Sequence, residues 1–221
     1  MYIRFVGHVC PIEENYHTKG ELTFAFSSDP IELGCSQVLI DIMAYDEQDS
    51  EVGKIGEIEL YSFNANHLGL DMFANNFDDF DPEGDLLEIM DNQSQEMYQY
   101  YNILSQYFMD AKASFPDEAA LEDCIEILDS DLSFVVLQRF FINPDWRKKG
   151  IGSFIMKNFS KIVYSSSHVD PVLVVGIINP DDRTDETKSV QKKLFKDAGY
   201  LVDKDDVGND VFAGYTWDWD V

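Results

Sequence analysis

The order of secondary structure in the last third of this chain constrains its fold more than any other feature. Residues 133–143 are mostly apolar and predict a strand. Residues 151–164 carry apolar residues at a helical spacing, and residues 172–178 form a near-continuous apolar run, typical of a strand buried on both faces. A strand, a helix and a strand joined by a short crossover make the two strands parallel. The sequence therefore predicts an α/β fold with a parallel pair in the middle of its sheet.

A second helix and two closing strands follow this unit. The helix is predicted at 186–198, where Gly199 would end it because glycine readily adopts the left-handed conformation of a helix C-terminus. The closing strands are predicted near 200–204 and 210–217. The side chains expected to be buried are Ile151, Phe154, Ile155, Phe159, Ile162 and Val163 in the first helix, and Val190, Leu194 and Ala198 in the second.

The earlier part of the chain first predicts strands and then helices. Apolar and polar residues alternate in 22–26, 38–44 and 52–63, and the last two stretches flank a polar turn. They therefore predict an antiparallel hairpin. The N-terminal residues also predict a strand. Residues 84–128 change to a helical spacing and are rich in acids, so an acidic helical segment is expected there.

Negative charge is concentrated in the first part of the chain. The net charge is −26, and residues 1–130 hold 4 lysines and arginines against 28 aspartates and glutamates, whereas residues 131–221 hold 12 against 14. Such a field repels nucleic acid and anionic lipid and attracts cations. Two explanations stay open. The acids provide a solvated surface that promotes solubility, or they attract a cationic substrate or a basic partner.

The sequence indicates a cytoplasmic protein without a metal site. No stretch approaches the ~20 apolar residues that a membrane-spanning helix needs, and the N-terminus lacks the features of a signal peptide. The three cysteines, Cys10, Cys35 and Cys124, are too widely spaced for a disulfide framework or a metal clip. The four histidines, His8, His17, His67 and His168, are isolated and lack metal-ligand spacing.

The connection between the strand at 133–143 and the following helix carries the clearest chemical signal. It contains Arg147-x-x-Gly150-x-Gly152, preceded by Ile142-Asn143-Pro144. The first N–H groups of a helix lack intrahelical partners, and the helix dipole makes this end positive. Two glycines allow a diphosphate to approach the main chain. Arg147, Lys148 and Lys149 add fixed positive charge beside the helix start at Gly150, Ile151, Gly152 and Ser153, so the sequence favours an anion there.

These elements resemble the GNAT superfamily of acetyl-CoA-dependent N-acetyltransferases. The resemblance covers residues 133–200 and includes the strand ending in Ile142-Asn143-Pro144, the glycine loop, and a later helix ending in Gly199-Tyr200. It implies a mostly antiparallel sheet with one splayed parallel pair and acetyl-CoA as acyl donor. By the same resemblance, the main chain around Ile142 would bind the pantetheine arm, and the N–H groups of 148–153 would hold the pyrophosphate.

The chain also departs from the GNAT pattern. Many members place a tyrosine, which protonates the leaving thiolate, four residues before the glycine that ends the last helix. Here that position is Phe195. Many also place a glutamate on the motif strand, where this chain has Gln138 and Arg139. The helices usual after the first strand are missing. The chain is therefore expected to be a single domain, 1–221, with an acidic helical insertion at 70–130.

Three other residues are candidates for the missing catalytic groups. Glu57 and Glu59 share one face of a strand expected beside the motif strand, and either could deprotonate an ammonium group through a water. The alternative is that both are ordinary outward carboxylates of a hairpin. Tyr215 on the last strand could replace the missing acid, or it could be a core or rim tyrosine.

The sequence supports two hypotheses of function. The first is an N-acyltransferase that moves acetyl from acetyl-CoA to a primary amine, with an oxyanion stabilised by a main-chain N–H and the acidic half attracting a cationic acceptor. The second is a catalytically weak protein on a GNAT scaffold. Its acidic surface would engage a basic partner, as a nucleic-acid mimic or regulator.

Overall fold

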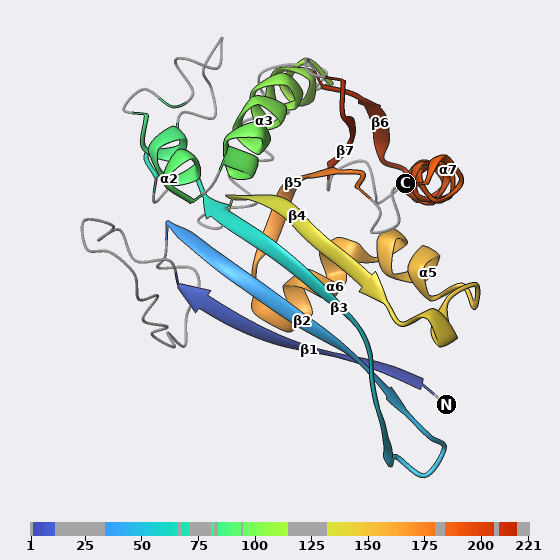
Figure 1. Cartoon of the computed structure of the whole chain (residues 1–221). Coiled ribbons are helices and arrows are strands. Elements are labelled where there is room, and N and C mark those ends of the chain that lie inside the picture. Colours follow the sequence, from blue (N-terminus) through green and yellow to red (C-terminus); the bar gives the residue numbers. More distant parts are fainter. Residues whose placement is uncertain are drawn as a thin grey trace.

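The described residues form one seven-stranded sheet in the order β1-β2-β3-β4-β5-β7-β6 (Figure 1). The strands are β1 (Tyr2–Pro11), β2 (Cys35–Tyr45), β3 (Glu51–Asn64), β4 (Leu132–Ile142), β5 (Asp170–Ile177), β6 (Leu201–Lys204) and β7 (Asp210–Tyr215). Neighbours are antiparallel except β4 and β5, which are parallel. The predicted fold class, an α/β fold whose mostly antiparallel sheet contains one parallel pair, is confirmed.

The computed structural model describes residues 2–11, 34–65, 68–70, 81, 84–93, 95–114, 132–179, 184–205 and 208–215. Several sequence predictions lie outside these residues. They are the strand at 22–26, the part of the helical segment beyond 114, the end of the last strand beyond 215, and the positions of His17, His67 and Cys124.

Helices cover both faces of the sheet. Helices α2 (Asp85–Gln93) and α3 (Gln95–Ser114) follow β3 and share a core with Phe134 and Val136 of β4. A 3-10 turn, η2 (Pro144–Trp146), joins β4 to α5 (Ile151–Lys157), which is followed by α6 (Phe159–Ser167) and, after β5, by α7 (Asp185–Asp197). These three helices share a second core with Val135 and Leu137. Alternate residues of a strand point to opposite faces, so the two cores lie on opposite sides of the sheet.

The β2–β3 hairpin is confirmed, and the residues of β3 alternate between the two faces as predicted. Ile58 and Leu60 are fully buried in the second core, beside α5 and α6. Glu57 and Glu59 alternate with them and face the side on which α2 and α3 pack. Leu39, the partner of Glu59 across the hairpin, is 37% exposed. Among the described residues, this part of the face is left open. We call it the open sheet face.

The parallel pair separates part-way along β4. The ladder between β4 and β5 ends where Val136 pairs with Val175, although β4 continues to Ile142 and stays paired with β3 as far as Gly56. We call the point where the two strands separate the fork. Just beyond it, a Cβ on Gly176 would lie 2.4 Å from the ring of Phe212. Glycine at this position therefore lets the aromatic ring pack directly on the sheet.

Two residues predicted to be buried are exposed. Phe154 of α5 is 56% exposed and Val190 of α7 is 63% exposed. The helical segment is interrupted at Asn158, where α5 ends and α6 begins. As a result, α5 packs through Ile151, Ile155 and Met156 and not through Phe154. Helix α7 packs through Phe195, five residues after Val190, which places the two side chains about 140° apart around the axis. No helix in the described part is long and apolar enough to cross a membrane.

Candidate functional site

The loop after β4 is fixed to the neighbouring strand. The backbone N–H of Asn143 donates to the carbonyl of Ile55 (2.8 Å), and its side-chain amide donates to the carbonyl of Lys54 (3.0 Å). Pro144 then begins the turn η2, in which the N–H of Trp146 bonds to Asn143. The fixed φ of proline suits the first position of a helical turn. These bonds hold the end of β4 at a defined point beside β3.

Two residues in the left-handed conformation turn this loop into α5. Lys148 has φ 59° and Gly150 has φ 81°, and a Cβ on Gly150 would meet nothing within 4 Å. Gly150 is the N-cap residue, so no side chain caps the first-turn N–H groups. Lys148 and Lys149 are exposed beside them, and the Lys149 ammonium lies 4.6 Å from the centre of the Trp146 ring. An uncapped helix start beside two lysines suits an anion.

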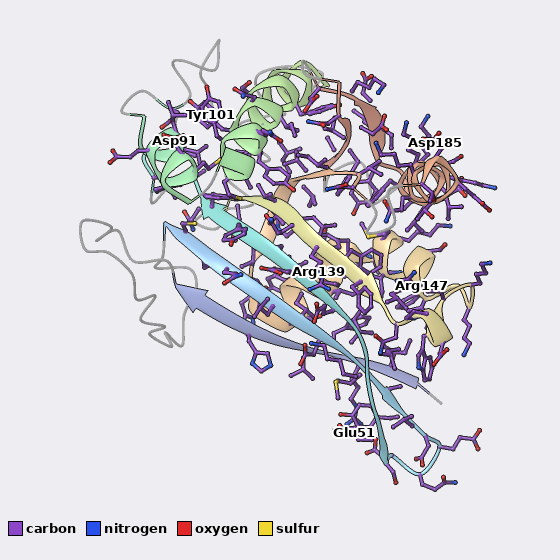
Figure 2. The ribbon with its side chains drawn as sticks, in the orientation of Figure 1. Glu51, Asp91, Tyr101, Arg139, Arg147 and Asp185 are labelled. Carbon is purple, nitrogen blue, oxygen red and sulfur yellow. The ribbon has the colours of Figure 1, made fainter. Side chains whose placement is uncertain are left out.

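Arg147 does not extend freely from this loop. Its Nε donates to the carbonyl oxygen of Ile142 at 2.7 Å, and its guanidinium carbon lies 5.5 Å from the centre of the Phe141 ring. The side chain is therefore turned back onto β4 (Figure 2). The sequence assigned Arg147 to the phosphates and the main chain of Ile142 to the pantetheine arm. In this structure the two residues are bonded to each other.

The remaining residues of the predicted anion site have separate roles in the packing. Ile151 is 9% exposed and belongs to the second core, whereas Ser153 is exposed. A Cβ on Gly152 would meet Ile142 at 3.7 Å and Leu194 at 3.8 Å, which are ordinary contacts. Gly152 therefore lies where α5 meets β4 and α7, and an alanine would fit there.

Four charged side chains of alternating sign are linked by ion pairs on the open sheet face. The ammonium of Lys54 lies 2.7 Å from Asp41 and 2.8 Å from Glu57, and Glu57 also accepts a 2.8 Å ion pair from Arg139. Hydrogen bonds to Asp41 and then to Glu57 raise the pKa of Lys54 above its ordinary value. We call these four residues the sheet-face network. It holds two cations and two anions, so its charges balance.

Glu59 has a different environment from Glu57. Its carboxylate accepts a 2.7 Å hydrogen bond from the neutral amide of Gln37, and the described residues give it no ion pair. It is also closer to the fork. Tyr61 pairs with Val136, the last β4 residue in the parallel ladder, and Glu59 is the next residue of β3 on the same face. Of the two glutamates predicted from the sequence, Glu59 is therefore the less constrained and the closer to the fork.

A β-bulge lies directly beside Glu59. Leu60 pairs with Leu137 and Glu59 pairs with Arg139, so Gln138 is an extra residue on β4. A bulge disrupts the regular ladder and redirects the strand. The side-chain oxygen of Gln138 is buried and has no hydrogen-bond partner among the described residues. Sequence reasoning missed the bulge because its only local signal is a polar residue within an apolar strand.

The residue in the position of the missing acid is buried among aromatic rings. Phe195 stacks on Phe212 with ring centres 3.9 Å apart, and Tyr200 contacts both rings edge-on. The hydroxyl of Tyr200 donates to the carbonyl of Met156, and burial raises the pKa of Tyr200 well above its ordinary value. Tyr215 pairs with Leu173 through the backbone, on the closed side of the fork, and its side chain lies outside the described part.

Comparisons with known proteins give a limited result. No protein-family model matches the sequence, and no curated protein matches it. Two similar solved structures are a mutant agmatine N-acetyltransferase in its apo form and a polyamine N-acetyltransferase of Drosophila melanogaster that forms N-acetylagmatine. Each has a TM-score of 0.37 and 12% sequence identity, and the alignments cover 80% of this chain and 73% and 74% of the other chains. At these low scores, the fold class rests on the strand order of this chain.

Proposed function

We propose that this chain is an N-acyltransferase that moves an acetyl group from acetyl-CoA to a primary amine. The observation that carries the proposal is the fork together with the loop that follows it. Beyond Val136, β4 has no ladder with β5, and it leads into an uncapped helix start at Gly150. A splayed parallel pair followed by such a loop is the arrangement that the GNAT resemblance implies.

The residues at the start of α5 fit the phosphates of an acyl-CoA. Lys148 and Lys149 are exposed, and the space above Gly150 is open. We assign the diphosphate to these lysines and to the first-turn N–H groups of α5. Arg147 would contribute by holding the end of β4, because its Nε is bonded to Ile142. The donor itself would supply a thioester, which amines attack more readily than they attack an amide.

Glu59 is the best-placed group to remove the proton of the attacking amine. It lies on the open sheet face beside the bulge, and within the part of the chain that the structure describes its side chain bonds only to the neutral amide of Gln37. Glu57 is already paired with Lys54 and Arg139. In the proposed reaction the amine nitrogen bonds to the acyl carbon and the carbon–sulfur bond breaks. Glu59 takes the amine proton, directly or through water, and the thiolate is protonated from solvent.

The acceptor is proposed to be cationic, attracted by the acidic N-terminal half of this single domain. Its contributors include the exposed Asp91 on α2, within the proposed insertion at 70–130 (Figure 2). Glu88 on the same helix is also exposed. Asp81 has a structural role instead. It is 6% exposed and its carboxylate accepts hydrogen bonds from the N–H groups of Leu86 and Leu87. Acceptor recruitment is therefore better tested by neutralising Glu88 and Asp91 than by changing Asp81.

Calorimetric titration with CoA tests the proposal directly. We expect binding in about the micromolar range. Replacing Gly150 would strain a backbone at φ 81°, so the sharper variant is Lys148→Asn. Asparagine tolerates the left-handed conformation of Lys148 while removing the ammonium group and most of its stem. We expect this change to weaken CoA binding about tenfold, because a charged hydrogen bond is lost.

Lys157→Gln is the matched control, since Lys157 is exposed in the last turn of the same helix. It should leave CoA binding unchanged. A folded protein that does not bind CoA would refute the proposal. The same outcome would favour the second hypothesis, a binding protein on this scaffold, for which the buried phenylalanine at 195 is the supporting observation. If CoA binds, a screen of amines with acetyl-CoA, scored by thiol release, will separate acceptors from inactive amines.

A further inference from the structure

Three lysines converge on one carboxylate away from the loop after β4. Asp210, at the start of β7, has its carboxylate 2.6 Å from the ammonium of Lys192, 3.4 Å from that of Lys204 and 3.6 Å from that of Lys188. We call these four residues the lysine cluster. The Asp210 side chain is 7% exposed, whereas the three lysine side chains are 35–62% exposed. The carboxylate is therefore buried beneath ammonium groups that solvent reaches.

The charges of the lysine cluster do not balance. Three cations surround one anion, which leaves an excess of two positive charges. The contrast is the sheet-face network, where Lys54 and Arg139 meet two carboxylates. One close ammonium is enough to compensate a buried carboxylate, and each additional one is repelled by the others. Hydrogen bonding to Lys192 lowers the pKa of Asp210, so the carboxylate stays ionised and the excess remains two.

The lysines come from two elements, α7 and β6, and the carboxylate comes from a third, β7. Lys188 and Lys192 are four residues apart on α7, so they share one face of the helix. Lys204 ends β6, and its ammonium also donates to the carbonyl of Gly208 at 3.0 Å. Lys188 lies in the first half of α7, where the helix dipole is positive and disfavours a cation. The fold therefore maintains a concentration of positive charge that internal contacts do not require.

We propose that the lysine cluster is a binding site for a phosphate dianion, whether inorganic phosphate or a phosphate monoester. A monoester dianion carries two negative charges at neutral pH, which matches the excess of two. Its three terminal oxygens can each accept from a separate ammonium group, and lysine binds phosphate as a compact point charge. A carboxylate carries half that charge and offers two oxygens, so it fits the cluster less well.

Two sources could supply this chemistry. One is free inorganic phosphate, and the other is the phosphate on the ribose of CoA. The second source rests on the proposed function, whereas the first does not. Leu194, two residues beyond Lys192 on α7, contacts the Gly152 position of α5, so the cluster and the start of α5 adjoin the same helix.

The first test is a titration with inorganic phosphate at constant ionic strength, with chloride as the balancing salt. Binding is followed by calorimetry and by the rise of the unfolding temperature. The wild type should bind phosphate, and Lys188→Gln should weaken binding about two- to fivefold because one exposed charge is lost. Lys193→Gln is the control. Lys193 is exposed on the same helix and the described residues give it no bond to Asp210, so phosphate affinity should not change.

Asp210→Asn provides a test in the opposite direction. Without the internal anion the three ammonium groups are uncompensated, so phosphate should bind at least about fivefold more tightly than to the wild type. Phosphate should also restore more thermal stability to this variant than chloride does at equal ionic strength. If phosphate and chloride act alike on both proteins, or if Lys193→Gln reduces affinity as much as Lys188→Gln, the inference is wrong.

The two sources are separated with acetyl-CoA and its 3′-dephospho form. If the ribose phosphate occupies the cluster, wild type will prefer acetyl-CoA and Lys188→Gln will lose that preference. If the preference is absent or survives the substitution while inorganic phosphate still binds, the free ion is the ligand. CoA binding without any phosphate response would reject this inference and leave the proposed function intact.

Discussion

The two sides of the fork differ in chemistry. On one side, β3 and β4 present polar groups on the open sheet face, including Glu59 and the sheet-face network. On the other side, α7 and β7 contribute Phe195 and Phe212, whose stacked rings are almost completely buried. Proton transfer needs a titratable group that substrate or water can reach. We infer that the β3–β4 side carries any acid–base chemistry and that the α7–β7 side provides rigidity.

The comparison also explains the departure at Phe195. A tyrosine hydroxyl at this position would need a partner inside an aromatic cluster, where Tyr200 already bonds to Met156. A buried hydroxyl without a hydrogen bond is costly. The phenylalanine is therefore consistent with a site whose proton donor is water or lies elsewhere.

The largest expected effect separates the two glutamates of the β3–β4 side. Glu59→Gln should lower acetyl transfer at least about 100-fold, because the amine loses its general base. Glu57→Gln should lower it far less, since Glu57 is held by two cations. Initial rates with a reactive amine measure both effects, and CoA titration checks that donor binding is unchanged. Equal losses in the two variants would mean that neither glutamate is the base.

A smaller effect tests the α7–β7 side. Phe195→Tyr should reduce the free energy of unfolding by about 1–3 kcal/mol, because the new hydroxyl is placed among buried rings. Turnover should not rise. Phe154→Tyr is the control, since Phe154 is 56% exposed and its hydroxyl would reach water. Urea unfolding and initial rates provide the measurements. A stable Phe195→Tyr protein with faster turnover would show that the α7–β7 side can supply a proton after all.

The smallest effects concern the dependence of stability on pH. The pKa of Asp210 is lowered mainly by Lys192, so its contribution is present above the ordinary aspartate range and is lost as pH falls through the folded value. The pKa of Lys54 is raised mainly by Asp41, so its contribution is present below the ordinary lysine range and is lost as pH rises through the folded value.

Urea unfolding across pH checks these two contributions. Asp210→Asn should flatten the acid side of the stability profile, and Lys54→Met should flatten the alkaline side slightly, because Lys54 is largely exposed. If neither substitution changes its side of the profile, or if each changes the other side, these two ion pairs do not make the predicted contributions to stability.

The local structure of the chain was largely predictable from the sequence. The alternation around Ile58 and Leu60 predicted the β2–β3 hairpin, and both side chains are buried as expected. Gly199 ends α7 with φ 95°, as its position after the helical pattern predicted. The run at 172–178 predicted β5 between two neighbours. These features depend on spacing within a few residues, which the sequence records directly.

Helix faces were less predictable. The pattern assigned Phe154 and Val190 to the core, and both are exposed. An apolar residue at the edge of a helical stripe can face either way, and the neighbouring elements decide which side is buried. In α7 the buried face is the one that carries Phe195, because Phe195 packs against Phe212 of β7.

The sequence by itself determined the strand–helix–strand succession around the fork, the glycine turn into α5 and the absence of a carboxylate on β4, because these are properties of adjacent residues. Only the tertiary structure decided which glutamate of β3 forms ion pairs with described residues and which lysines surround Asp210. Glu57 meets Arg139 through the pairing of β3 with β4, and Asp210 meets Lys192 through the docking of α7 on the sheet edge. Electrostatic contacts between groups so far apart in sequence depend on the register of strands and the rotation of a helix. Packing of the whole chain sets both.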